Sequence, residues 1–487
     1  MSVCKNQLSG CNIIPIVKSF EKESREIKID CAIKAEYDGF GKAAEVFSDA
    51  SERIFGANII PGEGGIYLIY DESIEEEEYK IIIDENVVVK ASGVQGISYA
   101  LASVLQLVKY KDGAMYFDKC RISDKPDKDY RGLMVDLARN WHPFDCLLKF
   151  VDICYFYKIK YLHLHFVDNE GYTLPSKAFP KLAKEGESYT FDEIAQLCEY
   201  AKERGIELIP EMEMPGHIYT LNEAYPEIFA NTPDEGADSS IVTENGAVLG
   251  GESVLCAGSQ KAFEGIIKLI DEVLDMFGCK YIHLGSDEVN TSAWDNCSVC
   301  REYMKKNSIK NAEELYCDFT RRVTEYVLNK GVTPIIWEGF GEEYSHMISK
   351  DVVVIGWESY YQNPEKLFKS GYKLINCSWQ PLYIVPSVTE RWGIKEILDW
   401  NVYNWQHWWE KSEATLNPIT LPESEQIWGA QICVWEQPYE RGINFLAENL
   451  AALTERVWSH RRYRTFAGFL EAYRFQSAKV FKLIARK

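Results

Sequence analysis

The sequence lacks an apolar run long enough to cross a membrane. Its uninterrupted apolar stretches, such as Ile13–Val17, fall far short of the roughly 18 residues that a spanning helix needs. It also lacks a surplus of basic residues. The 74 acidic residues against 53 Lys and Arg give a net charge of −21, which repels phosphate backbones and anionic lipids. We therefore expect no membrane segment and no nucleic-acid partner.

Low-complexity tracts and fixed-period repeats are missing too, and the apolar and charged fractions are those of an ordinary globular protein. The 14 cysteines spread along a long chain, from Cys4 to Cys433, which favours reduced thiols. The first ten residues contain no apolar core of the kind that a secretory signal has. We expect a cytoplasmic protein, although a secreted chain whose signal had been removed would look the same. The oligomeric state is left open, a homodimer included.

Two compositional regimes follow one another along the chain. Residues 1–127 mix short strand-like runs at 65–70, 79–83 and 87–90 with a helical apolar pattern at 94–109, which predicts a small α+β domain. The polar segment 124–129, with Pro126 inside it, predicts the boundary. A second domain is then expected over 128–487.

Eight β-branched, apolar runs follow the boundary and alternate with helical patterns. Such alternation predicts parallel strands joined by helices, and eight strands close a barrel. We therefore predict an α/β fold, a (β/α)8 TIM barrel preceded by the small α+β domain. The predicted strands are 131–138, 161–168, 206–214, 281–288, 333–339, 352–358, 372–378 and 427–436, and the helices include 144–157, 191–204, 261–277 and 312–329.

The carboxyl ends of these predicted strands are unusually polar. In such barrels the active site lies at these ends. Carboxylates and Arg bind hydroxyl groups and indoles stack on sugar faces, so the residues suit a carbohydrate. They are Asp136, Arg139, His165, Asp168, Glu211, Glu213, His217, Asp287, Glu288, Trp337, Glu338, Trp357, Glu358, Trp435 and Glu436.

Asp287 and Glu288 are the obvious carboxylate pair for hydrolysing a glycoside. Neighbouring residues in a strand point to opposite faces, so both can reach one pocket only where the strand flares into its loop. Otherwise one faces the cavity and the other caps the following turn.

Four motifs make the resemblance specific. They lie in order on successive predicted strands, and they are Arg131–Arg139 (RGLMVDLAR), His163–Gly171 (HLHFVDNEG), Ile209–His217 (IPEMEMPGH) and His283–Glu288 (HLGSDE). With these motifs the chain resembles glycoside hydrolase family 20, the β-N-acetylhexosaminidases, over nearly its whole length.

This resemblance implies exo-hydrolysis of terminal β-linked N-acetylglucosamine or N-acetylgalactosamine, with retention and without a cofactor or metal. The 2-acetamido oxygen of the sugar would attack the anomeric carbon and form an oxazolinium ion. Glu288 would be the general acid and base, and Asp287 would orient the acetamide group. Tyr383 would hydrogen-bond the acetamide carbonyl, while His217 and Asp168 would orient Glu288.

The resemblance also implies which residues bind the sugar, and there the chain departs from the family. An acid is usual two residues beyond the last-strand Trp and two beyond the acetamide Tyr, but this chain has Gln437 and Val385. Glu436 could substitute if the loop register shifts. Otherwise the pocket loses negative charge, and we hypothesise tolerance of an axial 4-hydroxyl or a 6-sulfate. The predicted sugar-binding residues are Arg139, His165, Trp337, Trp357, Trp435, Glu436 and Gln437.

Rival interpretations stay open at this stage. His163 and His165 resemble metal ligands of a TIM-barrel hydrolase, but the last strand offers no Asp to complete the shell. The barrel could also bind sugar without turnover, or use Glu211 or Glu213 as a nucleophile on sugars without the acetamide. Residues Cys297–Cys300 form a C-x-x-C pair, which could be half a zinc site or a redox pair. With no obvious second pair, free thiols are expected.

Overall fold

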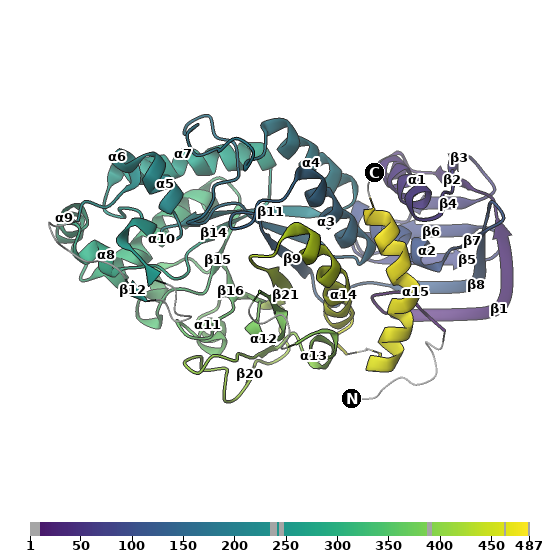
Figure 1. The fold of residues 1–487 in the computed structure, drawn as a ribbon. Helices are drawn as coiled ribbons and strands as arrows, with labels where there is room; N and C mark the ends of the chain where they lie inside the picture. The colour runs from purple at the N-terminus through teal and green to yellow at the C-terminus, as the bar shows by residue number, and fades with distance from the viewer. Residues whose placement is uncertain (1–9, 234–240, 243–247, 387–391, 462–463, 486–487) are drawn as a thin grey trace.

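The computed structural model describes residues 10–233, 241–242, 248–386, 392–461 and 464–485. Within these residues, no helix is both long enough and apolar enough to cross a membrane. Figure 1 shows a smaller N-terminal domain at one end of the molecule and a larger barrel domain beside it.

The N-terminal domain is a mixed sheet with two helices, as the α+β prediction requires. The sheet order is β1-β8-β5-β6-β4-β2-β3, with β7 on β8. Alternate residues of β4, β5 and β6 are buried, because one face of the sheet packs on apolar side chains of the helices. The elements are β1 Ser19–Ile29, β2 Ala32–Ala35, η1 Asp38–Phe40, α1 Gly41–Phe55, β3 Ile60–Pro61, β4 Ile66–Tyr70, β5 Tyr79–Ile83, β6 Val87–Ala91, α2 Val94–Leu107, β7 Lys109–Lys111 and β8 Ala114–Asp124.

The second domain is a closed barrel of eight parallel strands, so the predicted fold class is confirmed. Each predicted strand is present, and closure comes from the pairing of β21 with both β17 and β9. The barrel strands are β9 Tyr130–Asp136, β10 Tyr161–His165, β11 Glu207–Met214, β14 Tyr281–Gly285, β15 Thr333–Trp337, β16 Val353–Gly356, β17 Lys373–Asn376 and β21 Ile427–Val434.

Helices surround this barrel and short elements extend its loops. The N-cap Thr190 and Glu193 form a capping box that begins α4, and Gly278 in the left-handed region ends α7. The helices are α3 Phe144–Phe156, α4 Phe191–Glu203, α5 Tyr219–Ala224, α6 Pro226–Phe229, η2 Gly251–Ser253, α7 Gln260–Phe277, α8 Ser292–Asp295, α9 Ser298–Asn307, α10 Ala312–Asn329, η3 Glu342–Met347, α11 Pro364–Lys369, α12 Trp379–Leu382, α13 Ile394–Asp399, α14 Tyr439–Trp458 and α15 Phe466–Ile484. The short strands are β12 Ile241–Val242, β13 Val248–Leu249, β18 Tyr383–Ile384, β19 Asn404–Trp405 and β20 Ile419–Thr420.

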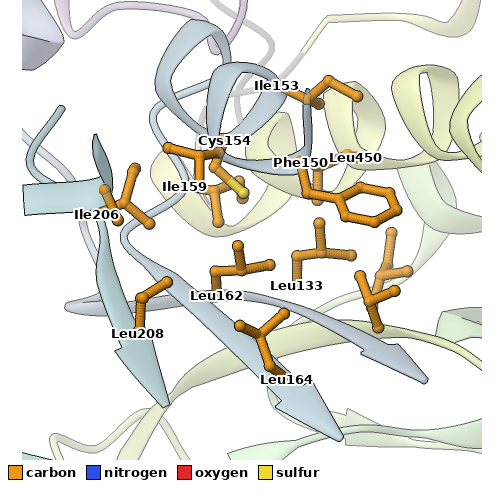
Figure 2. Close-up of a cluster of buried hydrophobic side chains, with 14 of the residues drawn as sticks. Leu133, Phe150, Ile153, Cys154, Ile159, Leu162, Leu164, Ile206, Leu208 and Leu450 are labelled. Carbon is orange, nitrogen blue, oxygen red and sulfur yellow. The ribbon is translucent and has the colours of Figure 1, made fainter. Parts of the chain in front are cut away.

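The core between the strands and the helices consists of buried apolar side chains. Figure 2 shows leucines of β9, β10 and β11 packed under side chains of α3 and α14. Burying each such side chain contributes about 1.5–3 kcal/mol, so this layer fixes the strands whose ends form the site. The labelled members are Leu133, Phe150, Ile153, Cys154, Ile159, Leu162, Leu164, Ile206, Leu208 and Leu450.

Helix α15 and a set of buried charges join the two domains. In Figure 1 this helix, drawn in yellow, runs between the N-terminal domain and the barrel helix α14. The Gln476 amide donates to the carbonyl of Asn12 at 2.8 Å. On the other side, Arg53 of α1 contacts the buried carboxylate of Asp152 of α3 at 2.7 Å. The barrel therefore packs directly against the N-terminal domain.

Candidate active site

The loop after β14 presents two neighbouring carboxylates to one pocket. Strand β14 ends at Gly285, and the next residues leave the extended conformation, with φ of +81° at Ser286 and +43° at Glu288. Gly285 has φ of +63°, and a Cβ there would lie 1.8 Å from Oε2 of Glu213, so only glycine fits. Polar atoms of Asp287, Glu288 and His217 lie within 4.8 Å of one another. The chain therefore leaves the strand conformation at this point, and both carboxylates lie close to His217.

A chain of polar contacts runs from the pocket rim to Glu288. Arg139 contacts Asp168 at 2.7 Å, Asp168 contacts Nδ1 of His217 at 3.2 Å, and Nε2 of His217 lies 3.4 Å from Glu288. Burial disfavours the Asp168 carboxylate, but Arg139 and His217 outweigh it and hold its pKa well below the usual range. Burial likewise opposes the His217 cation, but Asp168 raises its pKa above the usual value. The four residues form one row of polar contacts that ends at the predicted general acid.

Asp287 is a buried carboxylic acid with a free acceptor position. Its exposed fraction is 9%, and no residue in the described part of the chain hydrogen-bonds its Oδ1. Burial, together with the negative charges of Glu288 and Glu211, raises the pKa of Asp287 to about 7 against the opposing effect of His217. This carboxyl group therefore changes charge near neutral pH.

Aromatic rings from four strand ends form one wall at the carboxyl end of the barrel. The Trp337 ring centroid lies 6.2 Å from that of Trp357 and 5.9 Å from that of Trp435. Tyr383 stacks on Trp357 at 6.1 Å and on Trp379 at 4.4 Å. The Tyr383 hydroxyl is buried and has no hydrogen-bond partner among the described residues. The three predicted indoles and the predicted tyrosine are thus brought together.

Trp379 belongs to this wall and sequence reasoning missed it. Its position at the start of α12, four residues before Tyr383, was the only signal for it.

Glu338 anchors the loop that carries Trp357. Its carboxylate accepts the backbone N–H groups of Trp357, Ser359 and Tyr360 at 3.2, 3.1 and 2.8 Å. The residue is fully buried, and these three hydrogen bonds fix the backbone that carries an indole of the wall.

Glu211 organises the floor beneath the pocket. It contacts the ring nitrogens of His165, His283 and His163 at 2.5, 2.7 and 3.0 Å, and it accepts the indole N–H of Trp337 at 2.7 Å. The other nitrogen of His165 contacts Asp168 at 3.0 Å. His165 therefore lies behind Asp168, with both ring nitrogens occupied by carboxylates. Glu211 is an orienting group here, because its oxygens already bond to His165 and to the Trp337 indole.

The rim residues predicted to grip the far hydroxyls lie in different environments. Glu436 is exposed, and its backbone N–H donates to Asp136 at 3.1 Å. Gln437 is buried, and its amide donates to the carbonyl of Trp435 at 3.3 Å. Val385 is buried with the aromatic wall. Arg139 lies over the Trp435 ring at 5.2 Å and also faces Glu170 at 3.7 Å, a neighbour that sequence reasoning did not single out.

Family models match both domains. Residues 129–461 match the model described as glycosyl hydrolase family 20, catalytic domain, and residues 10–125 match family 20, domain 2. The chain belongs to glycosyl hydrolase family 20. The resemblance inferred from the four motifs is therefore confirmed.

Named relatives agree with this family assignment. A beta-hexosaminidase of Akkermansia muciniphila is 31% identical over 330 residues, which is 64% of this chain and 65% of that protein. Beta-hexosaminidase subunit B1 of Dictyostelium discoideum is 26% identical over 411 residues, covering 79% of this chain and 70% of its own. The match thus spans just under two thirds of the Akkermansia protein.

Solved family 20 structures share the fold. An exo beta-N-acetylglucosaminidase of Vibrio harveyi, in complex with N-acetylglucosamine, has a TM-score of 0.82 at 21% identity and covers 100% of this chain and 79% of its own. A beta-N-acetylhexosaminidase of Bacteroides fragilis has a TM-score of 0.79 at 21% identity, covering 98% and 96%.

Proposed function

We propose that this family 20 chain is an exo-acting β-N-acetylhexosaminidase. It hydrolyses terminal β-linked N-acetylglucosamine or N-acetylgalactosamine from oligosaccharides or glycoconjugates, with retention, using the sugar's acetamide as nucleophile. One observation carries the proposal. Asp287 Oδ1 and the Tyr383 hydroxyl, both buried at an indole wall, have no partner within the described residues. They offer an acceptor for an amide N–H and a donor for an amide C=O.

The first step breaks the glycosidic bond. Glu288 donates its proton to the leaving oxygen while the acetamide oxygen bonds to the anomeric carbon, which gives an oxazolinium ion. Asp287, as carboxylate, accepts the acetamide N–H and offsets the positive charge of that ion. Tyr383 holds the attacking oxygen in place, and the indoles pack on the methyl group and the sugar ring.

The second step restores the enzyme. Glu288 takes a proton from water, and the resulting hydroxide bonds to the anomeric carbon as the acetamide oxygen leaves. Two displacements on that carbon retain its configuration. The side chain of Glu288 is 13% exposed, which supports this exchange with solvent, and His217 at 3.4 Å orients it.

A panel of chromogenic glycosides tests the proposal. We expect turnover of 4-nitrophenyl β-glycosides of N-acetylglucosamine or N-acetylgalactosamine, and none of the matched 2-hydroxy glucoside. A thiazoline mimic of the oxazoline should inhibit competitively, and NMR should show the β-anomer formed first. Comparable turnover of the 2-hydroxy glucoside would exclude acetamide participation and favour a protein nucleophile.

We also propose tolerance of a 6-sulfated sugar. Gln437 and Val385 stand where the family pattern implies acids, and neither carries charge. A sulfate there meets less repulsion than it would meet between carboxylates. The test compares kcat/KM for plain and 6-sulfated 4-nitrophenyl N-acetylglucosaminide in the wild type and in Gln437→Glu. In the variant, kcat/KM for the sulfated substrate should fall more than kcat/KM for the plain substrate. A strong wild-type preference for the plain sugar would end this proposal.

We propose a cytoplasmic location because the described cysteines form no disulfide bonds. Every cysteine in the described part of the chain is unbridged, as in a reducing compartment. Cell fractionation with a cytoplasmic marker tests it, and recovery in the medium or envelope fraction would refute it.

A further inference from the structure

Three cysteines far apart in sequence meet beside the catalytic loop. Sγ of Cys256 lies 3.7 Å from Sγ of Cys297 and 3.6 Å from Sγ of Cys300, and all three residues are buried. Cys256 precedes α7, while Cys297 and Cys300 lie at the start of α9. A disulfide needs sulfurs about 2.05 Å apart, so these are three separate thiols. The C-x-x-C pair expected to be free thus has a third sulfur facing it.

The spacing of the sulfurs matches the edges of a metal-centred tetrahedron. Zinc–thiolate bonds of about 2.3 Å at tetrahedral angles put neighbouring sulfurs about 3.8 Å apart. The two measured separations fall within about 0.2 Å of that value, and the three sulfurs lie within 4.8 Å of one another. No sulfur would need to move far to bind one ion.

The surroundings of Cys297 favour a thiolate. Its sulfur accepts the backbone N–H of Thr232 at 3.4 Å, and the residue is the N-cap of the ten-residue helix α9, where the helix dipole is positive. A bound cation would take the place of the thiol protons at these sulfurs.

An amide oxygen lies beside one sulfur of this cluster. Oδ1 of Asn231 lies 3.9 Å from Sγ of Cys300. The Asn231 amide N–H donates to the carbonyl of Val254 at 2.6 Å, which turns the amide oxygen toward the sulfurs. The group of four is therefore built from two barrel loops, the one after β11 and the one after β14.

We propose that Cys256, Cys297 and Cys300, with Asn231, bind one structural Zn²⁺. The ion ties the loop after β11 to the loop that begins with Asp287 and Glu288. It lies outside the reaction path, since a four-coordinate site of protein ligands keeps no open position. Its role is to hold the catalytic loop, and the proposal does not depend on the substrate.

Metal content of the full chain is the first test. The protein is purified under reducing conditions, passed over chelating resin and measured by mass spectrometry for Zn²⁺. We expect one ion per chain, and none in Cys297→Ser or Cys300→Ser. Cys154→Ser is the matched control, because Cys154 is equally buried but packs in the apolar layer of Figure 2. Its zinc content should equal that of the wild type.

Cobalt substitution keeps the test independent of variant folding. Co²⁺ added to the chelator-treated wild type should give a thiolate-to-cobalt charge-transfer band, and Zn²⁺ should abolish that band by displacement. A wild type that binds neither ion in stoichiometric amount overturns the proposal. So does peptide mapping that finds Cys256 disulfide-bonded to Cys297 or Cys300, or a Cys154→Ser variant that loses the metal as well.

Discussion

Replacing Asp287 by Asn removes one charge from the proposed site while keeping the shape of the side chain. The carboxyl group is 9% exposed, so it acts in a medium closer to protein than to water. Opposite unit charges about 4 Å apart at an effective dielectric constant of about 20 attract by about 4 kcal/mol. At 1.36 kcal/mol per factor of ten, Asp287→Asn should lower kcat about 10³-fold if Asp287 offsets the oxazolinium charge.

The pH profile gives this prediction a second readout. The pKa of Asp287 is raised to about 7, so the carboxylate is present above that pH and is lost as pH falls through it. Wild-type kcat/KM for the 4-nitrophenyl N-acetylglucosaminide should therefore fall on the acid side with an apparent pKa near 7. Asp287→Asn should have no such acid limb.

Stability separates this effect from unfolding. A carboxyl group with a raised folded-state pKa binds a proton more tightly when folded, so it costs stability as pH rises above its unfolded pKa. The variant lacks this cost, and urea midpoints at pH 8 should be at or above those of the wild type. Residual activity within a factor of about ten of the wild type, or an unchanged acid limb, would refute the role given to Asp287.

Three further perturbations test neighbouring parts of the molecule. Glu288→Gln should lower turnover of a poor leaving group by about 10² to 10⁴, and azide should then yield a β-glycosyl azide; wild-type rates would remove Glu288 from the mechanism. Asp168→Asn removes the anion beside His217, so the pKa of His217, followed by NMR, should fall, and an unchanged pKa would contradict the contact between the two side chains. Asp152→Ala leaves Arg53 and the buried Arg204 without their shared carboxylate and should cost about 3–5 kcal/mol in urea unfolding. A loss under about 1 kcal/mol would mean that these charges find other partners.

The barrel was predictable because its signals are local. Each strand is a short β-branched run and each helix an apolar stripe, so both are visible within a window of about a dozen residues. The polar strand ends were predictable for the same reason, since parallel strands bring their carboxyl ends to one face. The same rule predicts that Asp287, Trp337, Trp357 and Trp435 lie near one another at that face.

The contacts that could not be predicted from the sequence depend on pairings between distant segments. Nothing near Cys297 indicates that Cys256, 41 residues earlier, faces it. The direction of His165 was equally hidden, because its environment depends on Glu211 from the next strand. Gln437 shows a third limit. Its contact with sugar stays a prediction, but the bond from its amide to the backbone carbonyl of Trp435 depends on loop register, which composition does not encode.

Backbone strain at the strand ends explains how neighbouring residues come to share the pocket. Non-glycine residues with positive φ occur just beyond β11, β14, β16 and β21, namely at His217, Ser286, Glu288, Ser359 and Glu436. Each such conformation costs on the order of 1–3 kcal/mol, and several sit within one rim. Such conformations persist only where the surrounding structure is rigid, and the apolar layer in Figure 2 provides that rigidity. The barrel core and the proposed catalytic geometry are therefore coupled, because apolar burial beneath the strands offsets the strain of the turns that bring Asp287 and Glu288 to one site.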